Sequence, residues 1–168
     1  MTRGGVRAAI ESHLGSEQVG RVIYGAIIGM ALIVVLEDHP PPAATDIGLL
    51  LATALAVGLA ELYSDVVGTE TRTRRRISRE RLHEILDDVV AVAVGIAFPS
   101  VFFLFALFGW IELETAFKDA KWSGLALIGF YGFCAARLAG ARIPIAVLQG
   151  LAVGAIGAIL VVFKAVVH

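Results

Sequence analysis

Two carboxylates stand in an otherwise apolar stretch of the chain, ALAVGLAELYSDVVG. Glu61 and Asp65 are four residues apart, so on a helix they share one face, which also carries the small residues Ala54 and Gly58. A charge inside a bilayer costs at least about 2.5–3.5 kcal/mol, so such a carboxylate needs a proton, a cation or a basic partner. The pattern indicates either an ion-transport site, where a proton is exchanged for a metal ion, or a structural ion pair. The candidate partner for that pair is Arg137 or another residue from a cytoplasmic helix end.

Further polar groups are candidates for the same ion path. Tyr24 in the first apolar run and Gln149 in the last one are plausible lining residues. Pro99 has no N–H, so the carbonyl of Gly95 loses its helical hydrogen-bond partner. That oxygen is then available to a cation or to a neighbouring helix, or the proline simply bends the helix.

Acidic residues near the inner ends of the apolar segments form a candidate metal site. Hard divalent cations bind several oxygen ligands, and softer first-row metals also accept Met or His. The predicted ligands are Glu61, Asp65, Glu84 and Asp88. The ion would be a transported substrate such as Fe²⁺ or Mn²⁺, and no resident cofactor is expected.

The elements that must position these groups are apolar helices. The chain has 168 residues, of which 58% are hydrophobic and 17% charged, whereas soluble domains are about 45–50% apolar and about 25% charged. A helix needs about 20 residues to cross a bilayer core of about 30 Å. Five stretches approach that length: residues 22–36, 47–67, 89–110, 122–139 and 143–167. We therefore predict an all-α polytopic membrane protein with five transmembrane helices over residues 21–168, preceded by an amphipathic interfacial helix over residues 1–20.

Charge asymmetry predicts the orientation. With five spans, every arginine of the chain falls on one side of the membrane and every lysine on the other. Cytoplasmic loops carry the Lys and Arg excess, so the N-terminus is expected inside and the C-terminus outside. The link over residues 69–88 would then be cytoplasmic. Its arginines are expected to face anionic lipid headgroups rather than nucleic acid, because aromatic residues are not interleaved with them: Arg72, Arg74, Arg75 and Arg76.

Small residues recur at helical spacing within the apolar segments. Close backbone contact through such residues packs helices in lipid. The predicted helix–helix faces, one of which is a candidate dimer face, contain Gly25 and Gly29, Ala54 and Gly58, and Gly150, Gly154 and Gly157.

Three segments resemble the VIT/CCC1 family of vacuolar iron transporters. GLAELYSDVVGTETRTR is similar to the family's GEYxSVxSQ region, with Glu61 in the place of its membrane glutamate. VGIAFPSVFF resembles the third span, with Gly95 and Pro99 in the Gly-x-x-x-Pro spacing. GFCAARLAGARIPIAVLQGLAVGAIGAILV is similar to the last two spans.

The resemblance implies a VIT-like fold of five spans, a cytoplasmic N-terminus, a homodimer and transport of iron or manganese. The chain departs from the family pattern at two places. Tyr24 precedes Gly25 where the family has an aspartate before a glycine, and the arginine-rich link replaces a Glu-rich helical domain between spans two and three. The resemblance therefore supports the fold and the dimer more than the identity of the ion.

Enzyme signatures such as HExxH, GxSxG or a phosphate-binding glycine loop are not found in the sequence. The predicted function is a proton-coupled divalent-cation transporter that works through Glu61, with Asp65 on its path. It would be a homodimer integral to a bacterial or archaeal inner membrane. The alternative is a non-transporting membrane scaffold whose arginine-rich link binds anionic lipids or a partner.

Overall fold

The computed structural model describes residues 16–167, which form helices and short links and contain no strand. The helices are α2 (Ser16–Leu36), α3 (Ala43–Thr73), α4 (Arg79–Ala97), α5 (Ser100–Leu107), α6 (Leu113–Leu138) and α7 (Ile143–Val167). The all-α prediction is confirmed. The interfacial helix predicted over residues 1–20 lies outside the described residues, except for residues 16–20, which begin α2.

Two of these helices, α2 and α3, are long and apolar enough to cross a membrane. A third span results if α4 and α5 are counted together as one bent span. The prediction of a membrane protein is therefore supported by two or three helices rather than by five. The apolar run of α6 is limited by Lys121 near its start and Arg137 in its last turn. In α7 the apolar helix found among the described residues is Ile143–Ile159, which is shorter than a span requires.

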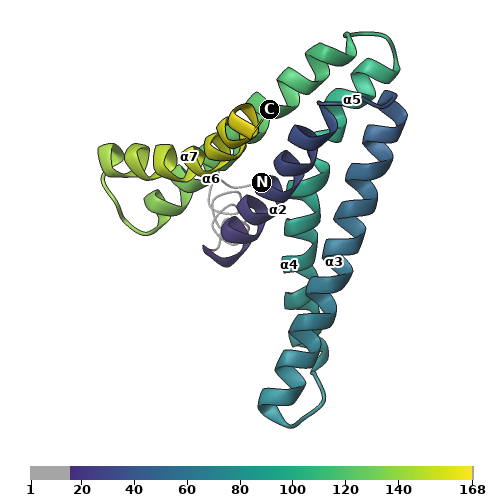
Figure 1. Cartoon of the computed structure of the whole chain (residues 1–168). Coiled ribbons are helices and arrows are strands. Elements are labelled where there is room, and N and C mark those ends of the chain that lie inside the picture. The colour runs from purple at the N-terminus through teal and green to yellow at the C-terminus, as the bar shows by residue number, and fades with distance from the viewer. Residues whose placement is uncertain (1–15, 168) are drawn as a thin grey trace, which may run out of the picture.

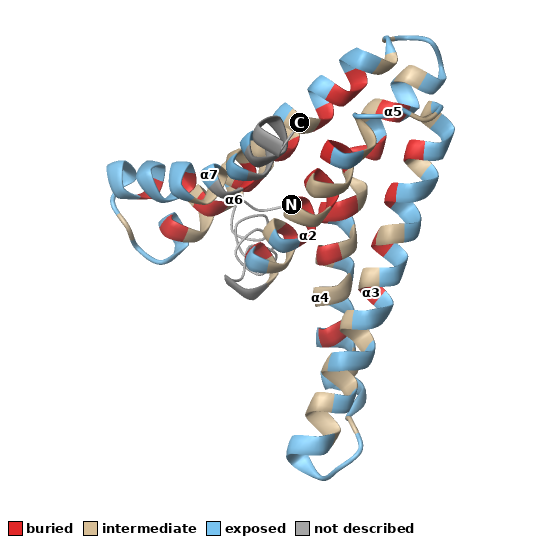
Figure 2. Cartoon of the chain, viewed as in Figure 1, coloured by how far each residue is buried: buried red, intermediate tan, exposed pale blue. Residues whose placement is uncertain are grey.

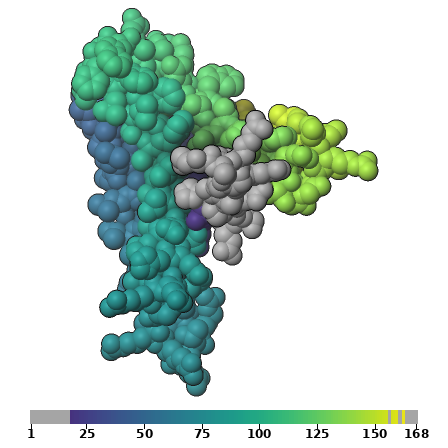
Figure 3. Space-filling model, turned by 180° about the vertical axis from the view of Figure 1, so that it is seen from behind, coloured from purple at the N-terminus to yellow at the C-terminus, as the bar shows by residue number. Residues whose placement is uncertain are grey.

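The helices form a V-shaped arrangement (Figure 1). One arm is the α3–α4 hairpin and the other is the α6–α7 hairpin, with α2 between them. Seen from behind, the two arms project separately from the body (Figure 3). The links over residues 37–42 and 108–112 lie at the closed end, which we call the apex. The arginine-bearing links over residues 74–78 and 139–142 therefore lie at the far ends of the arms.

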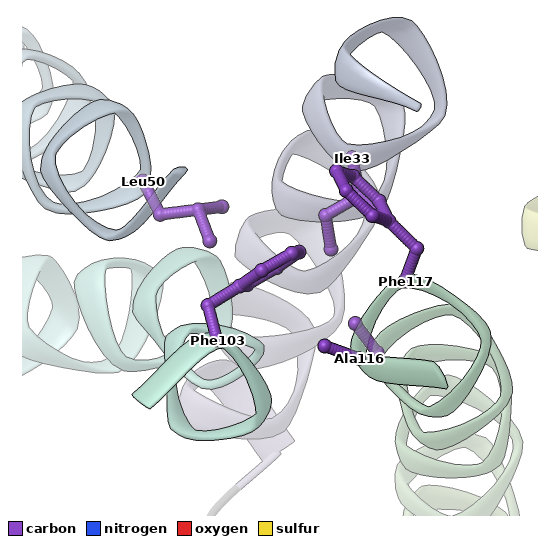
Figure 4. Close-up of a cluster of buried hydrophobic side chains, with 6 residues drawn as sticks. Ile33, Leu50, Phe103, Ala116 and Phe117 are labelled. Atoms are coloured by element: carbon purple, nitrogen blue, oxygen red, sulfur yellow. The ribbon is translucent and has the colours of Figure 1, made fainter. Parts of the chain in front are cut away.

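A cluster of fully buried side chains closes the apex (Figure 4). Ile33 of α2, Leu50 of α3 and Phe103 of α5 meet Ala116 and Phe117 of α6 there. The rings of Phe103 and Phe117 pack edge to face with their centroids 4.8 Å apart, an arrangement worth about 0.5–1.5 kcal/mol beyond the buried area. Four helices are thus joined at the apex by apolar packing.

Glycines let α2 and α4 cross with their backbones in contact. A Cβ atom on Gly25 would fall on the carbonyl oxygen of Val92, and one on Gly29 would lie 2.9 Å from the carbonyl oxygen of Ile96. From the other side, a Cβ on Gly95 would lie 2.7 Å from the amide nitrogen of Ala26. The helix–helix face predicted from the glycines of the first apolar run is confirmed, and its partner is α4 of the same chain.

The glycines of α7 make a second contact of this kind within the chain. A Cβ on Gly150 would lie 2.7 Å from the carbonyl oxygen of Gly129 on α6. A Cβ on Gly157 would lie 2.9 Å from the side chain of Leu125 on α6 and 3.4 Å from the sulfur of Met30 on α2. These positions are occupied by intramolecular packing rather than by a dimer contact.

The proline of the third apolar segment bends it, as predicted. Helix α4 ends at Ala97 and α5 begins at Ser100, with an angle of 45° between them. The hydroxyl of Ser100 donates a hydrogen bond of 2.6 Å to the carbonyl oxygen of Ala97 and so satisfies one carbonyl at the break. Beyond the bend, α5 turns toward the apex core through Phe103.

Candidate functional site

Helix α3 separates its faces as its sequence predicts (Figure 2). The outward face carries Leu51, Leu55 and Leu59, each at least half exposed. The buried residues recur every fourth position, the repeat of one helical face: Asp46, Leu50, Ala54 and Gly58. The same face continues into the partly buried Glu61 and Asp65. The buried face of α3 therefore begins and ends with carboxyl groups.

One arginine of α2 holds the carboxylates at the far end of this face. Nη1 of Arg21 lies 2.5 Å from Oε2 of Glu61, and Nη2 lies 3.1 Å from Oδ2 of Asp65. Asp88 of α4 is third, with its Oδ2 at 3.7 Å from Nη2. These side chains keep between 18% and 33% of their surface exposed, so the cluster is partly shielded from solvent. Charge-assisted bonds of this kind are about twice as strong as neutral ones.

Hairpin geometry explains why these residues meet. Antiparallel helices joined by a short link place residues at equal depth when they are equally far from the middle of the link. Arg21 and Glu61 are equally far along the chain from Pro41, in the α2–α3 link. Asp65 and Asp88 are likewise at nearly equal distances along the chain from the middle of the α3–α4 link over residues 74–78. The fold therefore brings one cation of α2 to the same level as three carboxylates.

A hollow of about 410 Å³ lies beside the cluster and reaches Asp65. It is lined along one side of α3 by Ser64, Asp65, Gly68, Thr71 and Arg72. Two hydroxyl groups, a carboxylate and a guanidinium thus line this hollow, which extends along α3 from Ser64 to Arg72. Water or a hydrated ion has room to approach Asp65 from that side.

The other predicted site residues lie away from the cluster. Glu84 pairs instead with Arg81 at 2.6 Å on the exposed side of α4, so the predicted ligand set is not brought together. Tyr24 is 45% exposed on α2, and Gln149 is exposed on α7. Within the described residues, no three His, Cys, Asp or Glu side chains are grouped so that they could hold a metal ion.

Arg137, the partner considered for Glu61, does not reach it. Its guanidinium donates a hydrogen bond of 2.7 Å to the carbonyl oxygen of Ala141 in the α6–α7 link. Arg137 lies in the last turn of α6, and the α6–α7 arm diverges from the α3–α4 arm (Figure 1). Glu61 does form a structural ion pair, but its partner is Arg21 of α2.

The arginines of the predicted lipid-binding link occupy the tip of the α3–α4 arm. Helix α3 ends here, and Arg74 takes a left-handed backbone conformation, with φ of 52°, that turns the chain toward α4. Every member of the group is exposed: Arg72, Arg74, Arg75 and Arg76. The tip is therefore a compact, exposed basic surface.

The sequence interpretation missed Asp46, in the first turn of α3. Its side chain is fully buried, and neither carboxylate oxygen has a hydrogen-bond partner. The helix dipole stabilises a nearby anion by about 0.3–1 kcal/mol, reaching about 2 kcal/mol in partly buried sites. An unpaired buried carboxylate costs more than that, so the neutral acid is favoured. The sequence signal for its burial was its spacing of four residues from Leu50, which places both on one helical face. This signal was not used, because the predicted span began at residue 47.

Arg21 was also missed as a site residue, because its charge was used only to predict the orientation of the chain in the membrane.

No protein-family model, no curated protein and no solved structure matches this chain.

Proposed function

We propose that the chain is a proton-coupled transporter of divalent cations, in which Arg21 holds the carboxylates when no ion is bound. The observation that carries the proposal is the sharing of one guanidinium by Glu61 and Asp65. Because three carboxylates surround this one guanidinium, the cluster carries two negative charges in excess, which a divalent cation or protons would neutralise. A divalent ion would compete with Arg21 for the same oxygens.

Access to the cluster supports this proposal. The hollow at Asp65 gives an ion a route from the arginine-rich end of the arm, which the positive-inside rule places in the cytoplasm. The carboxylates also lie on the same face as Ala54 and Gly58 rather than on the outward leucine face. Membrane carboxylates that face other helices in this way are characteristic of ion and proton pathways.

Five spans, the cytoplasmic N-terminus and a homodimer belong to the same proposal. It includes α6 and α7 as the remaining spans and a bacterial or archaeal inner membrane as the location. The VIT/CCC1 resemblance suggests iron or manganese as the ion. The glycines of α2, and Gly150 and Gly157 of α7, already pack within the chain, so the proposed dimer uses other surfaces.

Replacing Glu61 by glutamine should abolish cation uptake. We expect wild-type protein in liposomes to take up Mn²⁺ at a rate that depends on the pH gradient. We expect Glu61→Gln to fall to the level of empty liposomes, because the amide binds neither the metal nor an exchangeable proton. Uptake is measured with a fluorescent indicator inside the liposomes.

The matched control for this experiment is Glu84→Gln. It removes the same charge from an exposed residue that pairs with Arg81, and uptake should remain at the wild-type rate. Equal uptake by wild type and Glu61→Gln, or no uptake by wild type with Mn²⁺, Fe²⁺ and the other divalent ions tested, would refute the transport proposal.

The exposed basic tip favours a second function, binding of anionic lipid surfaces. Four arginines within five residues are exposed there, at the end of an arm that extends beyond the start of α2 (Figure 1). Each basic residue near an anionic membrane contributes about 1 kcal/mol. This function requires no ion flux and is compatible with a scaffold.

Removing three charges from the tip should weaken binding to anionic vesicles. For protein held in neutral-lipid nanodiscs, the variant with Arg74, Arg75 and Arg76 replaced by glutamine should lose about 3 kcal/mol, or roughly a hundredfold in affinity. Flotation with phosphatidylserine vesicles measures this binding. Lys118→Gln, near the apex, should bind like wild type. Binding that is insensitive to salt and to the three substitutions would contradict a lipid-binding tip.

A further inference from the structure

Asp46 is the only fully enclosed ionisable side chain among the residues whose side chains are described. Its relative exposure is 0%, and both carboxylate oxygens lack a hydrogen-bond partner. It stands one turn before Leu50 and next to Ile47, both of which belong to the apex core. A carboxyl group is thus set against apolar packing, at the opposite end of the α3 face from Glu61.

Among the described residues, none forms a hydrogen bond or ion pair with the carboxylate of Asp46. Helix α5 has no ionisable residue, and those of α4 lie between Arg79 and Asp88, toward the tip of the arm. The ionisable groups of the apex links and of the first half of α6 are Glu37, Asp38, His39, Glu112, Glu114, Lys118, Asp119 and Lys121. Among these, Lys121 pairs with Glu37 at 2.5 Å and Lys118 with Glu114 at 2.7 Å.

We propose that Asp46 is a proton-binding site, occupied by a proton in the conformation described here. Burial without a cation or a hydrogen-bond donor disfavours the ionised carboxylate and favours the neutral acid relative to an exposed aspartate. A metal ion is the poorer occupant, because it requires several oxygen ligands. Ser100, the other buried polar side chain among the described residues, uses its hydroxyl on the carbonyl oxygen of Ala97.

The coupling role of this proton in transport rests on the proposed function. The binding of the proton to Asp46 does not, because it follows from the burial of the side chain. Asp46 and Glu61 lie on one face of a continuous helix, roughly 22 Å apart at 1.5 Å per residue. In a proton-coupled exchange, Glu61 is the cation-binding carboxylate and Asp46 is the group that carries the proton at the apex. Movement of the apex core would expose Asp46 to water and release the proton.

Infrared spectroscopy of the full chain in nanodiscs tests for the proton directly. We expect wild-type protein at about pH 5, where an exposed aspartate is mostly ionised, to show the carbonyl stretch of a protonated carboxylic acid. This band should be missing from Asp46→Asn and retained in Glu61→Gln. Labelling the protein with ¹³C-aspartate should shift the band in the wild type, which provides a test that needs no substitution. No protonated-acid band at this pH, or an unshifted band after labelling, would overturn the assignment.

A transport measurement then separates the proton site from the proposed function. If Asp46 carries the proton, Asp46→Asn in liposomes should still take up Mn²⁺ down its own gradient, but the rate should no longer respond to a pH gradient. A rate that still responds as in the wild type would overturn the coupling role of Asp46. Failure of the wild type to transport would refute only the transporter, because the infrared band is read without any flux.

Discussion

Arg21→Gln should destabilise the protein more than the loss of any exposed charge, by about 2–3 kcal/mol. Removing one partner of a fully buried ion pair costs about 3–5 kcal/mol, because the other charge is left unpaired. We expect a smaller value because the side chains of the cluster keep 18–33% of their surface exposed. Thermal unfolding in detergent, followed by circular dichroism, measures the loss.

The physical cause can be tested by a second substitution. Arg21→Gln leaves Glu61, Asp65 and Asp88 facing one another, so the additional change Glu61→Gln should recover part of the stability. Arg81→Gln, which breaks the exposed pair with Glu84, should cost less than about 0.5 kcal/mol. Equal losses for Arg21→Gln and Arg81→Gln would show that the cluster does not support the fold.

Gly25→Ala should have a comparably large effect through the backbone contact between α2 and α4. The added methyl group would overlap the carbonyl oxygen of Val92. Rigid backbone atoms cannot yield as a flexible side chain does, so the helices must separate. Overpacking of this kind costs typically about 1–3 kcal/mol and occasionally more. Gly25 is one turn after Arg21, and Val92 one turn after Asp88, so the separation should also loosen the ion cluster.

Gly20→Ala is the matched control on the same helix. A Cβ there meets nothing within 4 Å, and alanine is favoured over glycine inside a helix by about 1 kcal/mol. Its melting temperature should therefore equal or exceed that of the wild type. Thermal unfolding of the two variants side by side gives the comparison. Similar melting temperatures for Gly20→Ala and Gly25→Ala would contradict a close crossing at Gly25.

Local features of this fold could be predicted because they depend on nearby residues. The sorting of α3 into a leucine face and a small-residue face follows from helical periodicity, and the bend at Pro99 follows from its missing N–H. The partner of Glu61 was predicted only as Arg137 or another residue from a cytoplasmic helix end, and Arg21 was not singled out. Arginine at a helix end satisfies the positive-inside rule whether or not it pairs, so sequence position alone did not distinguish Arg21 from Arg137.

The arrangement of the arms depends on contacts between distant segments. The divergence of the α6–α7 hairpin is set by the apex core and by the glycine contacts of α6 and α7, whose partners a single sequence does not specify. This divergence places Arg137 far from the carboxylates. Asp46 was missed because an acidic residue after three prolines is also typical of a solvated turn, and only the packing of the apex shows it to be buried.

The ion cluster joins segments that leave the ribosome at different times. Arg21 is synthesised 40 residues before Glu61, which takes several seconds at about 5–20 residues per second. If α2 crosses the bilayer as proposed, the long arginine side chain can keep its charge in the headgroup region during that interval. The α3–α4 hairpin supplies the partners later, so the ion pairs that hold α2 in the V form only after α3 and α4 have been synthesised.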